Sequence, residues 1–346
     1  MSLAFETFNA YMEGIQKFGV NLGGLCSMGV VLIKLGIFKT NKYQSFVSYI
    51  FQNERCMNNS NIPELKQYYI HETNKTLKVV KSFKYCMILF IIVCSLLSIS
   101  FIVKYEVFDY SEKDMFKPLY MPMKMPFDPI EHYILTNILF MATSPGIGVI
   151  TMAVDFVELC PTIYLVHRMK NLNYVLENME RFVRYYNFKS QDVHSNIVIQ
   201  CIREHQVIIS EVHLCNSSLK NILLLDFLFH SSKIAFFASA FIGNESLLVM
   251  ENMMAFAAFS YVFTQLFIIY WYGQILGEES EKIVTSIYLS NWYTLNSKSK
   301  HFLRIMMMRS QKPLGLTIGP FRMVSLRIFL QVVKTVYSTI MFLLRK

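Results

Sequence analysis

The side chains best suited to chemistry lie in one apolar stretch, where Asp226 and His230 are one helical turn apart and Lys233 follows on nearly the same face. With Ser231 beside them, a nucleophile and a base are conceivable. Hydrolase chemistry would also need an oxyanion turn of the GxSxG kind, and the sequence contains none. Charged groups inside an apolar helix more often stabilise helix packing or face water. We therefore expect no enzymatic activity from this cluster.

A second pair of charges lies in the last apolar stretch. Arg327 and Lys334 are seven residues apart, so they share one face of a helix. Exposure of both side chains to lipid would be costly. Two interpretations remain open: the two cations are buried against carboxylates of neighbouring helices, or they face a water-filled conduit.

Cofactors, metals and nucleic acids find little support in the sequence. The seven cysteines form neither a CxxC pair nor a cluster with histidine, so we expect no zinc site, no disulfide framework and no cofactor. The net charge of +9 might suggest nucleic acid, but Lys and Arg alternate between loops instead of forming one stripe. Two glycine pairs, Gly19-x-x-x-Gly23 and Gly273-x-x-x-Gly277, are weak signals of close helix contact.

The elements that position these residues are those of a polytopic, all-α membrane protein. Hydrophobic residues make up 53% of the chain and charged residues only 16%. A bilayer span needs about 20 apolar residues. Residues 1–276 are predicted to hold five spans, and residues 277–346 a cytoplasmic segment followed by a sixth. The six predicted spans are about 16–34, 86–103, 133–155, 221–242, 253–276 and 323–344.

Loop charge predicts the orientation of the spans. The connectors alternate between basic and acidic along the chain, and basic loops mark the cytoplasmic side. Both termini are therefore expected outside the cell. The long cytoplasmic connectors show helical spacing of apolar residues, so spans three to six should continue as helices into the cytoplasm. Pro145 should kink the third span.

The outer halves of the spans share a composition that suits a pocket for an apolar small molecule. Aromatic residues and methionines occur there with a few hydroxyl groups. Plain helix packing explains any single one of them equally well, and only their shared depth favours a pocket. The candidates are Phe18, Leu22, Ser95, Ser98, Phe101, Ile102, Met141, Ser144, Ile147, Phe256, Phe259, Ser260 and Phe263.

The last sixty residues carry an ordered set of motifs. Tyr288-x-x-x-Trp292 is followed by Arg309-Ser310-Gln311-Lys312-Pro313 and then by Lys334-Thr335-x-Tyr337-Ser338. This combination resembles the insect odorant receptor family, with weaker similarity at Lys34–Phe38 and Leu119–Pro129. The resemblance implies seven spans and an external C-terminus. Only six spans are visible here, and the first resembles the family's second, so we expect an N-terminally truncated form.

The resemblance also implies a function. It predicts an odorant-specific subunit of a tetrameric, ligand-gated, non-selective cation channel formed with a shared coreceptor, in the plasma membrane of an olfactory neuron, with a small volatile hydrophobic ligand. A gustatory-type receptor channel and a G-protein-coupled seven-helix receptor are the alternatives. Asp-Arg-Tyr and Asn-Pro-x-x-Tyr motifs, which the last would favour, are absent. The implied pore residues are Ser338, Met341, Phe342 and Arg345, and the implied assembly anchor holds Tyr288, Trp292, Arg309, Gln311 and Pro313.

Overall fold

The computed structural model describes residues 29–58, 62–103, 131–183, 193–240 and 249–344, and it confirms the all-α prediction. Outside its helices, the described part pairs Thr317 with Met323 in an isolated antiparallel bridge. A helical segment, Gly29–Phe38, comes first. The following elements are α2 (Asn41–Asn58), α3 (Pro63–Ile102), α4 (Tyr133–Glu177), α5 (Met179–Val183), α6 (Val193–Ala240), α7 (Val249–Leu289), η2 (Trp292–Thr294), α8 (Ser297–Ser310) and α9 (Leu326–Leu344).

Four helices are much longer than a membrane is thick. α3, α4, α6 and α7 have 40, 45, 48 and 41 residues. At 1.5 Å per residue α6 extends about 70 Å, against roughly 30 Å for a bilayer core. α4, α6 and α7 thus extend as helices well beyond the predicted spans 133–155, 221–242 and 253–276, whereas the predicted sixth span lies in α9, a separate helix of 19 residues. α4 also stays helical through Pro145.

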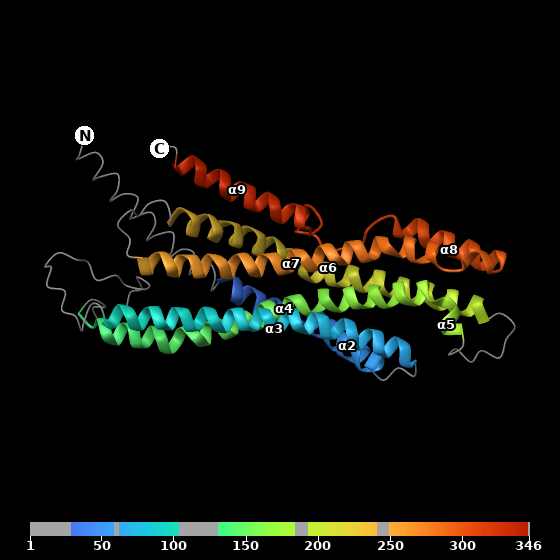
Figure 1. The fold of residues 1–346 in the computed structure, drawn as a ribbon, viewed down its shortest axis with the longest axis horizontal. Coiled ribbons are helices and arrows are strands. Elements are labelled where there is room, and N and C mark those ends of the chain that lie inside the picture. The colour runs from blue at the N-terminus through green and yellow to red at the C-terminus, as the bar shows by residue number, and fades with distance from the viewer. Residues whose placement is uncertain (1–28, 59–61, 104–130, 184–192, 241–248, 345–346) are drawn as a thin grey trace.

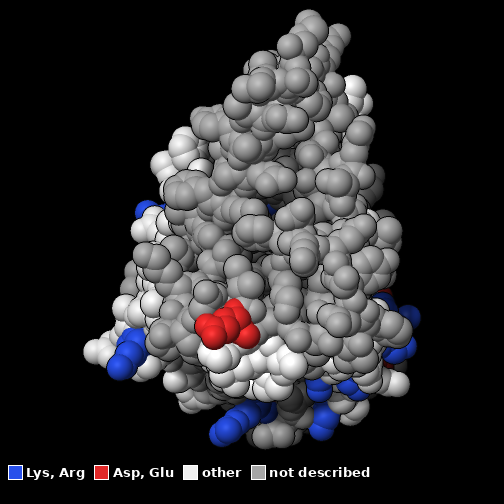
Figure 2. All heavy atoms as spheres, turned by 90° about the vertical axis from the view of Figure 1, so that its left-hand side faces the viewer, with Lys and Arg blue, Asp and Glu red and all other residues white. Residues whose placement is uncertain are grey.

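The helices lie side by side along the long axis of the molecule (Figure 1). The last residues of α9 and the paired ends of α3 and α4 lie at one end of the bundle, and α5 and α8 lie at the other. We call these the α9 end and the α8 end. Figure 2 views the α9 end, where basic side chains lie near the lower edge in separate groups and one acidic patch lies inward of them. The described atoms on this face form no continuous basic surface.

Hydrophobic side chains divide between a core and an exposed belt. The core joins α4, α6, α7 and α8, with Leu165, Leu176 and Leu276 fully buried. Large apolar side chains on α3 and α4 instead point outward, as expected for helices that meet lipid. These exposed residues include Ile88, Leu89, Ile92, Leu96, Ile99, Ile134, Leu135, Ile138, Val149 and Ile150.

Length and composition alone identify one stretch within the described residues, Gly146–Glu177, that could cross a membrane. It overlaps the predicted span 133–155. Local sequence explains where the neighbouring elements begin. α3 starts at Pro63, where the missing N–H leaves no hydrogen bond unmade. α8 starts after Asn296, whose side chain accepts a hydrogen bond from the Ser299 N–H at 2.8 Å.

Candidate functional site

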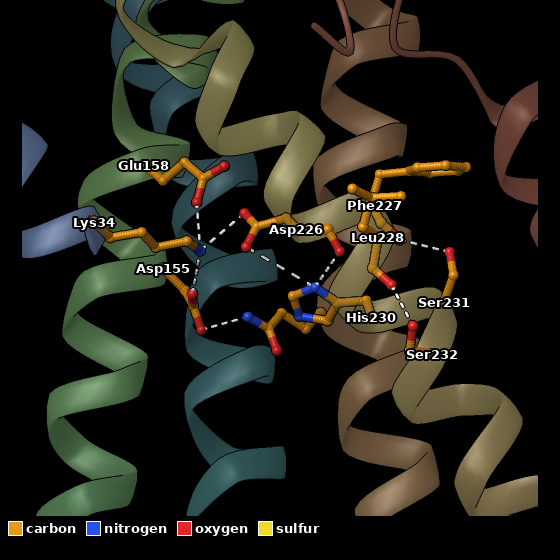
Figure 3. A network of polar contacts seen from close by, with 10 residues as sticks. Lys34, Asp155, Glu158, Asp226, Phe227, Leu228, His230, Ser231 and Ser232 are labelled. Atoms are coloured by element: carbon orange, nitrogen blue, oxygen red, sulfur yellow. Dashed lines mark hydrogen bonds and ion pairs between the residues drawn. The ribbon is translucent and has the colours of Figure 1, made fainter. Parts of the chain in front are cut away.

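A buried ionic cluster lies where three parts of the chain meet (Figure 3). The Lys34 Nζ lies 3.1 Å from Asp155 Oδ1, 2.7 Å from Glu158 Oε2 and 2.9 Å from Asp226 Oδ2. Lys34 comes from the Gly29–Phe38 helix, Asp155 and Glu158 from α4, and Asp226 from α6. Only 2% of Lys34 is exposed. One ammonium group therefore ties together carboxylates from two long helices.

Two further side chains complete this cluster. The Gln265 amide on α7 donates to Asp155 Oδ2. The His230 Nδ1 lies 2.7 Å from the backbone oxygen of Asp226 and 4.0 Å from its Oδ1. Buried charges are tolerated only when they are paired and hydrogen-bonded. The cluster thus holds four helical elements in one arrangement.

The contacts do not favour covalent chemistry at this cluster. Ser231 donates its hydroxyl hydrogen to the carbonyl of Phe227, one turn back on the same helix, and not to His230. Lys233 is half-buried and the sequence had grouped it with Asp226, yet the partner of Asp226 is Lys34. Among the described residues no group of His, Cys, Asp and Glu side chains could hold a metal ion. The ion pairs of this cluster hold the helices together.

Sequence reasoning missed Lys34, Asp155 and Glu158. The available signal was a charge balance: a lysine ends one apolar stretch, and two carboxylates three residues apart end another. Because spacing along the chain does not tell which distant helices meet, the pairing itself was not predictable.

A second cluster holds α9 against α7. The ring of Phe329 on α9 lies 5.1 Å from Phe263, 5.6 Å from Phe267 and 6.2 Å from Tyr270, measured between ring centroids. The three α7 residues follow helical spacing, so they form one face of that helix. Edge-on aromatic contacts of this kind stabilise packing by about 0.5–1.5 kcal/mol beyond the burial of area. We call these four residues the aromatic clasp.

The α7 backbone approaches the start of α9 closely at Gly273. A Cβ atom there would lie 2.5 Å from Val324 Cγ1, whereas one at Gly277 would meet nothing within 4 Å. The close contact that the sequence suggested only weakly is present at Gly273, against the connector before α9, and absent at Gly277. The Gly19 pair lies outside the described residues.

The connector between α8 and α9 is fixed to two helices. The Asn216 Oδ1 on α6 accepts hydrogen bonds from the Thr317 N–H at 2.8 Å and the Thr317 hydroxyl at 3.1 Å. The Gly319 N–H donates to the Lys220 carbonyl at 2.9 Å, and the Leu314 N–H donates to Ser280 Oγ on α7 at 2.8 Å. The position of α9 thus depends on both α6 and α7.

Gly319 has a structural reason to be glycine. Its φ of +55° lies in the left-handed region, and a Cβ there would come 2.9 Å from Leu224 Cδ2. The turn before α9 can therefore lie flat against α6.

Polar ties strengthen the helices toward the α8 end. Lys170 on α4 and Lys75 on α3 each place Nζ 2.6 Å from a Glu72 carboxylate oxygen. Burial opposes ionisation of Glu72, but the hydrogen bonds from both lysines outweigh it and lower its pKa to about 2. Burial, with a contribution from the Arg309 guanidinium, lowers the pKa of His205 to about 4. At neutral pH Glu72 is ionised and His205 is neutral.

The predicted anchor residues lie around α8 and the turn before it. Tyr288 is 69% exposed, and Gln311 and Pro313 are also exposed. Trp292 is half-buried against the core, and Arg309 donates from Nη1 to the Lys312 carbonyl at 3.3 Å. Tyr288, Gln311 and Pro313 are therefore accessible at the surface of the chain near its α8 end.

The predicted pocket residues are only partly described. Ser95 is half-buried and donates to the Ile91 carbonyl at 2.9 Å, while Ile147 and Phe256 are exposed. Phe259, Ser260 and Phe263 are half-buried, and Phe263 belongs to the aromatic clasp. Five further candidates have a helical backbone, but their side chains lie outside the described part: Ser98, Phe101, Ile102, Met141 and Ser144. Phe18 and Leu22 lie wholly outside the described residues.

The predicted pore residues lie near the end of α9. Ser338 is exposed and Met341 is 44% exposed on the surface of the chain. The Phe342 side chain and the whole of Arg345 lie outside the described part. Arg327 and Lys334 are both exposed, so the interpretation that buries them against carboxylates is wrong. The helix turns Ile328, Val332 and Val336 inward, and it turns these charges outward beside the exposed Leu330 and Tyr337.

Comparison with known proteins identifies the family. A family model described as 7tm odorant receptor matches residues 18–337. Odorant receptor 82a of Drosophila melanogaster is 24% identical over 329 residues, covering 90% of this chain and 80% of the relative. Odorant receptor 10 of Aedes albopictus is 28% identical over 181 residues, which is 51% of this chain and 46% of that protein. The chain thus spans about half the length of some curated relatives it matches.

Solved structures show the same fold. The insect olfactory receptor OR5 from Machilis hrabei in complex with eugenol superposes with a TM-score of 0.73 at 16% identity, covering 99% of this chain and 87% of that one. Without that ligand, the OR5 structure gives a TM-score of 0.75 at 15% identity, covering 97% and 83%. With the family match over most of its length, the chain belongs to the 7tm odorant receptor family of multi-pass membrane proteins.

Proposed function

We propose that the chain is the odorant-binding subunit of a heteromeric, ligand-gated, non-selective cation channel formed with a shared coreceptor. The observation that carries the proposal is the division of α9 into two faces. Ile328, Phe329 and Val332 are buried against the chain, while Ser338 and Met341 remain exposed. A helix that keeps polar groups on its free face inside a membrane needs water or another subunit on that side.

The odorant would bind among the outer halves of the spans. Phe259 and Phe263 stack with 5.9 Å between ring centroids, and Phe263 also contacts Phe329 on α9. An apolar ligand beside these rings would therefore touch the aromatic clasp. Such a ligand opens the pore only if it binds the open arrangement more tightly than the closed one. Displacement of Phe342 would then open a hydrophobic constriction.

The segment that follows α7 would form the assembly anchor. Exposed apolar residues occur on η2 and α8, where Tyr293 is 63% exposed, Met308 56% and Ile305 47%. Surfaces of this kind mark interfaces between chains. The protein would work in the plasma membrane of an olfactory neuron, with an external C-terminus.

Electrical recording with matched cysteine variants tests the channel. Cells expressing the chain with the coreceptor should give odorant-evoked currents that neither subunit alone gives across an odorant panel. A charged thiol reagent should then alter the current of Ser338→Cys and leave that of Val336→Cys unchanged, because Ser338 is exposed and Val336 is 7% exposed. Equal effects on both variants would contradict the pore assignment.

Labelling of a C-terminal epitope on intact cells separates the remaining alternatives. Staining from outside is expected for the channel. Cytoplasmic staining would favour a G-protein-coupled receptor and contradict our proposal. Currents evoked by non-volatile tastants alone would instead favour a gustatory-type channel.

A further inference from the structure

The exposed face of α9 carries a continuous polar stripe. Arg327, Gln331, Lys334 and Ser338 are all exposed, and the steps between them are four, three and four residues. In an α-helix such steps keep every member within about 40° of a common line. The stripe thus runs from the first turn of α9 to the predicted pore residue Ser338.

The two cations of the stripe have no carboxylate partner in the part of the chain that the structure describes. No carboxylate of the described residues forms an ion pair with Arg327 or Lys334. The face that packs against the chain is instead the opposite one, with Ile328, Val332 and Val336. Both charges therefore point away from the core of their own chain.

Lipid is an unsuitable environment for this stripe. A cation in the middle of a bilayer costs about 3 kcal/mol or more, and Lys334 lies about 12 Å along α9 from its first residue. An amide and a hydroxyl group on the same line would add to that cost. Water on this face accounts for all four side chains at once. Because Ser338 belongs to the same line, the water is that of the ion path, which rests on the proposed channel function.

We propose that Arg327 and Lys334 line the inner part of the ion path and make this subunit discriminate against divalent cations. A positive potential lowers the local concentration of a monovalent cation by some factor, and that of a divalent cation by the square of the factor. We estimate the size of this effect from Coulomb's law for one charge at about 6 Å in water, screened over a Debye length of about 8 Å. Each charge then lowers the local concentration of Na⁺ about 1.7-fold and that of Ca²⁺ about threefold.

The test measures relative permeability. Arg327→Gln and Lys334→Gln are each expressed with the coreceptor, and reversal potentials are recorded with external Na⁺ replaced by Ca²⁺. Each variant should raise the Ca²⁺/Na⁺ permeability ratio about 1.7-fold, since the divalent gain exceeds the monovalent gain by that factor. Lys334→Arg should keep the wild-type ratio because the charge is retained.

A matched control lies outside the stripe. Lys298 is exposed on α8, and Lys298→Gln removes the same charge without touching α9. Its ratio should equal that of the wild type. Ratios unchanged in both stripe variants, or shifted equally by Lys298→Gln, would overturn the inference. If the wild-type chain with the coreceptor gives no odorant-evoked current at all, the channel function itself is rejected instead.

A second measurement does not depend on ion permeation. In Gln331→Cys, the reaction rate of a negatively charged methanethiosulfonate divided by that of a positively charged one should be higher than the same ratio for a free thiol in solution. The difference should shrink when Lys334→Gln is added, because the neighbouring charge is gone. A difference that persists unchanged would also overturn the inference. If one charge variant fails to reach the cell surface, the other charge variant and the thiol reaction still test whether these cations face the ion path.

Discussion

Lys34 forms ion pairs with three carboxylates on two helices. Its Nζ contacts three carboxylates that belong to α4 and α6, in a place where 2% of the residue is exposed. Removing one partner of a buried ionic group costs more than the pair contributes, because the remaining charges are left without compensation. The fold therefore depends on this ammonium group.

Lys34→Met should lower the free energy of unfolding by about 3–5 kcal/mol. The methionine fills a similar volume but leaves Asp155, Glu158 and Asp226 facing one another. Thermal unfolding of the detergent-solubilised protein measures the effect. Lys39→Met serves as the control, since Lys39 is exposed and should change stability by less than about 0.5 kcal/mol. Equal transition temperatures for both variants would contradict the role given to Lys34.

At the scale of elements, α7 and α9 act as one packed unit. The aromatic clasp holds the first half of α9, and Gly273 allows the backbone of α7 to approach Val324 just before α9 begins. The connector is also fixed to α6 through Asn216. A movement of α6 relative to α7 would therefore have to displace the base of α9.

Gly273→Ala should destabilise the protein by about 1–3 kcal/mol, because the new methyl group would overlap the Val324 side chain and crowd its carbonyl. Gly277→Ala is the matched control four residues away, where nothing lies within 4 Å. There the higher helix propensity of alanine should leave stability unchanged or raise it. The thermal unfolding temperature should thus fall for Gly273→Ala and stay the same or rise for Gly277→Ala, and an equal fall in both variants would reject the close contact.

At the scale of the whole molecule, the buried core and the outward apolar belt lie in different parts of the bundle. The two tryptophans of the chain test this division. Trp271 on α7 is 45% exposed inside a predicted span, whereas Trp292 is half-buried against the core in the segment assigned to the cytoplasm. Lipid should therefore reach one indole and not the other.

Quenching by brominated phospholipids measures this difference. In reconstituted vesicles, Trp292→Phe leaves only Trp271, whose fluorescence should be strongly quenched. Trp271→Phe leaves only Trp292, which should be quenched weakly. The reverse order would contradict the predicted orientation of α7 in the membrane.

The sequence was sufficient for features that depend on periodicity. The all-α class, the helical character of the long connectors and the shared face of Arg327 and Lys334 all follow from spacing along the chain. Whether that shared face is buried or exposed was left open, because exposure depends on which neighbours cover a helix. The structure resolves this by placing Phe329 inward and Lys334 outward.

Contacts between distant segments were beyond sequence reasoning. Asp226 was recognised as an intramembrane charge, but its partner Lys34 lies in another helix far away along the chain. Gly273 and Gly277 look alike in the sequence, and only the path of the connector distinguishes them. The odorant pocket remains a prediction, since most of its side chains lie outside the described residues.

The bond between Asn216 and Thr317 has a consequence for the interpretation of one sequence motif. Asn216-Ser217-Ser218 matches the acceptor sequence for N-linked glycosylation. In the folded chain the Asn216 carboxamide is engaged by the backbone and hydroxyl of Thr317. Because both groups donate to the Asn216 Oδ1, this side chain holds the connector against α6. The asparagine of this sequon therefore has a structural role, and its replacement would free the connector from α6.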